Sequence, residues 1–195
     1  MSVKEIRAKF PIKTILKILG EPNYKAINEL IEVLYANAAS IPTTLGGGRN
    51  GHIGLLMDVA VYDNAATTSY ARPTDPGPYA QHSTGNSAVA RADANSIHKE
   101  GRKIYDLDKK LDAALKQEII VAVEETYLSA KNQRYMGFHS VSSKNLVDYL
   151  MERYGKIIAS DFKACKQSLV NTIEVYRLID VYFQQVEDVI HFHRT

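Results

Sequence analysis

The stretch from residue 91 to 133, RADANSIHKEGRKIYDLDKKLDAALKQEIIVAVEETYLSAKNQ, decides the fold class because its apolar residues recur every three or four positions. Apolar side chains at this spacing fall on one face of an α-helix, with charged residues on the other face. The recurring residues are Ile104, Leu107, Leu111, Leu115 and Ile119. The pattern fits one long helix, and it equally fits two helices broken near residues 108–112.

Two further helices are predicted before the glycine-rich part of the chain. Asn23 is a favourable N-cap for YKAINELIEVLYANAA, whose apolar residues form a one-sided pattern. Upstream of it, residues 11–20 form PIKTILKILG, with Pro11 acceptable in a first helical turn and Gly20 as a stop. The helical spacing there rests on Ile12, Ile15, Leu16 and Leu19.

More helical patterns follow on the C-terminal side. HIGLLMDVAVYDNA, residues 52–65, keeps the 3.6-residue period. Ser142 or Ser143 caps KNLVDYLMERYG, and Gly155 ends it. Asp161 and Asp180 are candidate caps for two last helices. No convincing two-residue alternation typical of strands occurs, so the predicted class is all-α, a multi-helix bundle.

Residues 62–90 are rich in proline, glycine and small polar residues, as in YARPTDPGPYAQHSTGNSA. Such a composition cannot bury enough apolar surface to fold by itself, so a long irregular loop or flexible linker is expected here. The predicted organisation is therefore an N-terminal helical segment, 1–61, with a glycine-rich turn at 46–54, then the linker and a helical core over 91–195.

The glycine-rich stretch TLGGGRNGHIGLLM, residues 44–57, has two interpretations. Gly46, Gly48 and Gly51 fit G-x-G-x-x-G, but dinucleotide binding needs a preceding strand, and ANAASIPTT is a poor one. We expect a turn or hinge instead. Its glycines are Gly46, Gly47, Gly48 and Gly51. A nucleotide- or phosphate-binding loop over Gly46–Gly54, with Arg49 making a weak anion contact, is the alternative.

Composition gives no sign of catalysis. The net charge is +2, one cysteine is present, and the six histidines lack the spacing of metal ligands on a helix. The sequence predicts no catalytic residue, no cofactor and no metal site, and Cys165 is expected to be a buried inert thiol.

No apolar run reaches the length of a membrane span, so a cytoplasmic protein without membrane contact is expected. An RNA-binding adaptor remains a further alternative, using Lys4, Arg7, Lys9, Lys13 and Lys17.

Two stretches together resemble a known family. FPIKTILKILGEPNYKAINELIEVLYANAASIPTTLGGGRNGHIGLLM (10–57) and LDAALKQEIIVAVEETYLSAKNQRYMGFHSVSSKNLVDYLMERYGKI (111–157) are similar to the N-terminal portion of Gag polyproteins of copia-type long-terminal-repeat retrotransposons. The order and spacing of several short motifs carry the resemblance. They are Phe10-Pro11, Asn37-Ala38, the Gly46–Gly48 run, Gly51-His52, Tyr154-Gly155 and YFQQVED.

The resemblance implies a helical capsid-like fold, self-assembly into homo-oligomeric particles around element RNA, and no enzymatic activity. It also implies that the glycine stretch is a turn into a helix. The sequence departs from the family in having no proline over residues 157–180 and no Cys-Cys-His-Cys knuckle. RNA is therefore expected to be bound weakly, or through segments outside this chain. The departures leave three interpretations of the chain: a Gag fragment, a decayed copy or a domesticated copy.

Overall fold

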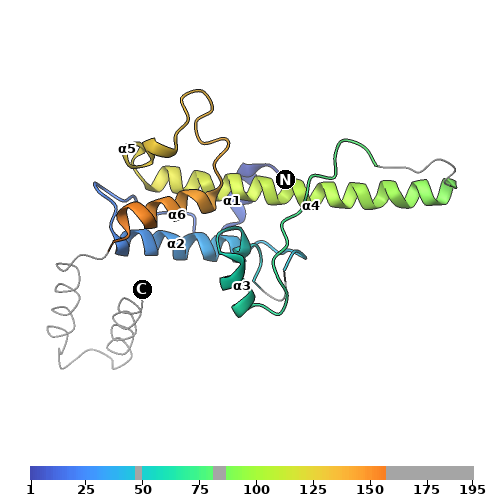
Figure 1. Ribbon diagram of the computed structural model, residues 1–195, viewed down its shortest axis with the longest axis horizontal. Coiled ribbons are helices and arrows are strands. Elements are labelled where there is room, and N and C mark those ends of the chain that lie inside the picture. The colour runs from blue at the N-terminus through green and yellow to red at the C-terminus, as the bar shows by residue number, and fades with distance from the viewer. Residues whose placement is uncertain (47–49, 81–86, 157–195) are drawn as a thin grey trace. The chain divides into compact units, whose positions relative to one another are not determined.

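The computed structural model describes residues 1–46, 50–80 and 87–156 (Figure 1). The chain forms two compact units, Met1–Gly155 and Lys156–Thr195, and all the described elements lie in the first. The domain boundaries predicted at residues 61 and 90 both fall inside this unit. Cys165 and the helices predicted after Asp161 and Asp180 lie outside the described residues.

Every regular element of the described residues is a helix, which confirms the all-α class. The elements are α1 (Val3–Lys9), α2 (Tyr24–Ala39), the 3-10 helix η1 (Ile53–Leu55), α3 (Val59–Ala65), α4 (Ala88–Ala122), α5 (Glu125–Leu128), the 3-10 helix η2 (Ser129–Lys131) and α6 (Ser143–Tyr154). The predicted caps are confirmed: the Asn23 side chain accepts from the amide of Ala26, Ser142 accepts from that of Asn145, and Gly155 is the C-cap of α6.

The core lies where α2, α6 and the C-terminal half of α4 pack side by side, with α1 against α4 (Figure 1). Each helix buries residues three or four positions apart, as a 3.6-residue repeat requires. The fully buried ones include Ile27 and Leu34 of α2, Leu111, Leu115 and Ile119 of α4, and Leu146 and Leu150 of α6. Residues 88–107 of α4 include no buried residue.

Helix α4 runs without a break through residues 108–112, so the single long helix is the correct one of the two predicted arrangements. It ends at Ala122 rather than near residue 133, because Val123 turns to an extended conformation. Val123 then forms an isolated parallel bridge with Ile18. The predicted helix over 52–65 is likewise interrupted, since residues 56–58 separate η1 from α3.

The helix predicted over residues 11–20 is wrong. The first helix lies upstream, where Ser2 and Glu5 form a reciprocal capping box that starts α1. The chain after Pro11 is non-helical and is held to other elements at both ends. The Asn37 side chain bonds both the amide and the carbonyl of Ile12, at 3.1 and 3.0 Å, and the Ile18 amide donates to the Ala122 carbonyl at 2.7 Å.

Burial along this segment recurs every third residue. Ile12, Ile15 and Ile18 are half-buried, whereas the two residues after each isoleucine are exposed. A three-residue repeat without internal hydrogen bonds is typical of an extended, polyproline-II-like chain. Since a spacing of three also occurs on helices, the sequence pattern alone could not separate the two conformations.

Candidate functional site

The glycine-rich stretch is packed tightly where it is described. Gly51 has a φ of +52°, and an added Cβ would overlap the carbonyl of Ala39. The next amide, that of His52, donates to the Ala38 carbonyl at 3.0 Å, so the chain turns directly against the end of α2. Gly47, Gly48 and Arg49 lie outside the described residues, and the anion contact assigned to Arg49 stays a prediction.

Two other glycines make room for tyrosine rings. A Cβ on Gly46 would overlap the hydroxyl of Tyr62, and one on Gly54 would overlap the ring of Tyr70. The two rings pack edge to face with centroids 5.6 Å apart. Glycine is therefore needed at these positions for packing, because any larger side chain would displace a buried ring. Sequence reasoning did not single out Tyr62 or Tyr70.

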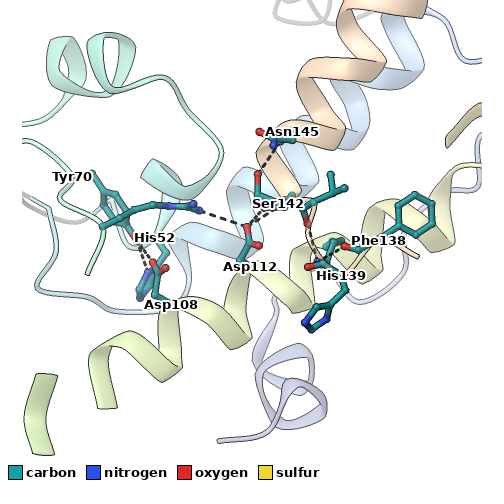
Figure 2. A network of polar contacts seen from close by, with 12 residues as sticks. His52, Tyr70, Asp108, Asp112, Phe138, His139, Ser142 and Asn145 are labelled. Atoms are coloured by element: carbon teal, nitrogen blue, oxygen red, sulfur yellow. Dashed lines mark hydrogen bonds and ion pairs between the residues drawn. The ribbon is translucent and has the colours of Figure 1, made fainter. Parts of the chain in front are cut away.

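A buried chain of hydrogen bonds joins the glycine-rich stretch to α4 (Figure 2). His52 Nδ1 lies 2.8 Å from the Tyr70 hydroxyl, which donates to Asp108 Oδ1 at 3.1 Å. Because the hydroxyl proton is directed at Asp108, the hydroxyl oxygen must accept from Nδ1–H of His52. This tautomer leaves His52 Nε2 as a bare acceptor, and Nε2 has no hydrogen-bond partner among the described residues.

Burial shifts the pKa values of all three residues in this series of hydrogen bonds. It lowers the pKa of His52 to about 4, which keeps the imidazole neutral at physiological pH. Burial also raises the pKa of Tyr70, reinforced by the neighbouring Asp108 carboxylate. The pKa of Asp108 is raised by burial, although Arg72 and the Tyr70 hydroxyl act in the opposite direction. The three hydrogen-bonded groups, with His52 neutral, hold the glycine-rich stretch and the segment at Tyr70 to α4.

Asp112, one turn further along α4, anchors the start of α6. Its Oδ1 accepts from the amide of Ser143 at 3.1 Å and from the Ser143 hydroxyl at 2.7 Å. Arg72 Nη2 lies 3.6 Å from the same oxygen. One carboxylate thereby links α4, α6 and the segment that follows Tyr70.

Lys116, a further turn along, holds the turn before α6. Its ammonium donates to the carbonyls of Phe138 at 2.8 Å, His139 at 3.4 Å and Val141 at 2.8 Å. Burial lowers the pKa of Lys116, against the opposing effect of Asp112. Asp108, Asp112 and Lys116 lie four residues apart and are called here the polar stripe of α4.

A cavity of about 390 Å³ lies over the polar stripe. It is lined by Arg72, Asp108, Lys109, Asp112, Ala113, Lys116 and residues 139–142. The stripe residues already have partners within the chain: Asp108 with Tyr70, Asp112 with Ser143 and Arg72, and Lys116 with three carbonyls. Each of these interactions joins two segments of the chain, so the stripe residues act as structural anchors.

The described ranges contain no group of three or more potential metal-ligating side chains. The described histidines His52, His98 and His139 are separate from one another in their contacts: His52 meets Tyr70, and His98 meets the Gly77 carbonyl. None of the helices in those ranges has the length and apolar character needed to cross a lipid bilayer.

A second candidate site is an exposed apolar edge. Leu16 and Leu19 are 78% and 81% exposed, in the extended segment that follows α1. Val121, which is 51% exposed, directly precedes Ala122, whose carbonyl accepts from the Ile18 amide. Burying these leucine side chains against another surface would be favourable, because it removes apolar area from water.

Comparison with known proteins adds no identification: no protein-family model, curated protein or solved structure matches the chain.

Proposed function

We propose that this chain is a non-enzymatic, Gag-like structural protein of the cytoplasm that self-associates into capsid-like assemblies packaging element RNA. The resemblance of residues 10–57 and 111–157 to copia-type Gag supports this proposal, and an all-helical unit fits it. The observation that carries it is the exposure of Leu16 and Leu19 on a segment whose Ile15 and Ile18 pack on the core.

Other exposed apolar side chains are distributed over separate elements. They are Val59 and Val61 of α3, Val89 and Ile97 of α4, and Tyr135 and Met136 before α6. Single exposed apolar residues are ordinary on a protein surface. A shell, however, needs more than one weak contact per copy, because symmetry multiplies each contact into cumulative binding.

The polar stripe supports a structural role for the cavity. Its charged residues hold α4 to the glycine-rich stretch, to α6 and to the turn at 138–141. A protein that assembles through surface contacts needs interior interactions that keep those surfaces in fixed positions.

Sedimentation velocity over a concentration series tests the proposal. The mean mass should rise from low to high micromolar protein, and electron micrographs at high salt should show particles or sheets. A protein that remains monomeric at hundreds of micromolar would contradict self-association. A rise in melting temperature with added nucleotide, lost in Arg49→Ala, would favour the nucleotide-binding alternative instead.

RNA packaging is tested separately by filter binding across a salt series. An electrostatic contact should weaken steeply as salt rises, because bound counterions are released from the phosphates. Of the basic residues near the N-terminus, Arg7 forms an ion pair with buried Glu118, so its charge is less available to phosphates than those of Lys4, Lys9 and Lys17. Binding that is absent at low salt would remove RNA from the proposal.

A further inference from the structure

Three exposed residues, each three positions from the next, lie along the exposed apolar edge, and we call them the leucine ridge. They are Lys13, Leu16 and Leu19. These residues share one side of the extended segment because burial repeats every three residues, with Ile12, Ile15 and Ile18 on the core side. The ridge is pinned at both ends, by Asn37 at Ile12 and by the Ala122 carbonyl at Ile18. The ridge is therefore held to α2 and to the end of α4.

The backbone of the ridge is available as well. Among the described residues, no hydrogen bond involves the backbone amides of residues 13–17. Extended segments without internal hydrogen bonds bind partners at low entropic cost, since their conformation is already set.

The charges around the ridge are opposite at its two ends. Lys13 is exposed at the start, and Glu21 is exposed just beyond Leu19. Glu124 joins the acidic end, where its carboxylate accepts from the Gly20 amide at 3.1 Å. Neither Lys13 nor Glu21 forms an ion pair with another described residue. The exposed Lys17 falls on another side of a three-residue repeat. Along the ridge itself a base stands at one end and acids at the other, and this arrangement is complementary to itself.

We propose that the leucine ridge, with Val121 beside it, is a homotypic contact that pairs with the same ridge of a second copy about a two-fold axis. The inference rests on the proposed self-association and names the surface that performs one step of it. In an antiparallel pair with Leu16 opposite Leu19 of the second copy, Lys13 lies beside Glu21 of that copy. A two-fold contact repeats each of these pairings.

The contact is small, with three apolar side chains from each copy. Stable dimers bury about 1,200–2,000 Å² in total, so this surface supports a weak dimer and becomes effective when other contacts act with it. We therefore expect a reversible monomer–dimer step at high micromolar protein, before larger assemblies appear.

The test uses the full chain in sedimentation equilibrium. The double variant Leu16→Ser/Leu19→Ser should weaken the dimer at least about tenfold, because the two-fold axis removes each leucine twice. Its melting temperature should match that of the wild type, since both side chains are exposed. The matched control is Val59→Ser/Val61→Ser, which removes two exposed apolar side chains from α3 and should leave this dimer step unchanged.

Charge reversal makes the test specific for two-fold pairing. Lys13→Glu and Glu21→Lys should each weaken the dimer about threefold to tenfold, because each places like charges opposite one another. The combination Lys13→Glu/Glu21→Lys should restore most of the affinity. A mixture of the two single variants should form mixed dimers in preference to either variant alone.

Each outcome bears on the proposal. Dimers that persist in the leucine variant would overturn this surface and leave the proposed self-association standing, whereas a monomeric wild type would overturn both. A leucine variant with lower melting temperature and unchanged mass would show that the ridge is covered within one chain, and that result also overturns the homotypic contact. Weakening by both single charge variants without rescue would refute the antiparallel arrangement.

Discussion

The buried His52 predicts a loss of stability on mild acidification. His52 is 1% exposed, and its pKa is about 4 against an ordinary value of 6.5. In the unfolded chain the imidazole binds a proton as the pH falls below 6.5, whereas the folded state resists protonation until about pH 4. The folded state is therefore favoured above pH 6.5, and this stabilisation is lost as the pH falls toward 4.

The magnitude follows from the difference between the two pKa values. It is about 2.5 pKa units, and each unit corresponds to about 1.36 kcal/mol, so the loss is roughly 3 kcal/mol. Asp108 acts in the opposite direction, because its raised pKa makes the folded state bind a proton more readily as the pH falls. The contribution of His52 must therefore be measured as a difference between variants that retain Asp108.

The assay is urea unfolding, followed by circular dichroism, at intervals from pH 7 to pH 4. His52→Asn should be less stable than the wild type at pH 7, through its lost contact with Tyr70, but should lose about 3 kcal/mol less on acidification. His139→Asn serves as the control, since that side chain is exposed. Parallel stability curves for the wild type and His52→Asn would refute the assignment of a buried neutral histidine.

Three further substitutions test the packing and the anchors. Gly54→Ala should destabilise by about 2–3 kcal/mol in urea, because its Cβ would overlap the Tyr70 ring. Gly101→Ala, in the middle of α4, would add only an ordinary van der Waals contact with Pro76 at 3.9 Å and should stabilise by about 0.5–1 kcal/mol. Equal effects of the two substitutions would contradict the packing argument. Asn37→Ala should cost about 2 kcal/mol and speed hydrogen exchange at the Ile12 amide, which loses its acceptor. Unchanged exchange there would show that Asn37 does not hold the segment. Lys116→Met keeps the apolar stem but removes three contacts to carbonyls, so we expect a loss of about 1–2 kcal/mol, and a stability equal to the wild type would refute the anchoring role.

Local signals in the sequence predicted the helices that local chemistry determines. Asn23 and Ser142 cap their helices through side-chain bonds three residues away, and the stripe from Leu111 to Ile119 needs only a 3.6-residue repeat. The capping box of Ser2 and Glu5 was an equally local signal for α1, which the sequence reasoning did not use.

Other features depend on residues far apart in the chain. The conformation of the segment after Pro11 is fixed by Asn37 and Ala122, which no local pattern reveals. Asp108 did carry a signal, because it is a carboxylate on the face that α4 buries. Its partners Tyr70 and His52 come from regions expected to be a loop and a turn, and only the tertiary structure brings them together.

The ion pair between Arg7 and Glu118 joins residues separated by 111 positions. During synthesis at roughly 5–20 residues per second, α1 and α2 emerge from the ribosome roughly 5–20 seconds before the part of α4 that covers them. Their apolar faces have no α4 to pack against during that interval. Translation speed and polysome density are thus expected to influence how much of this protein reaches its native state.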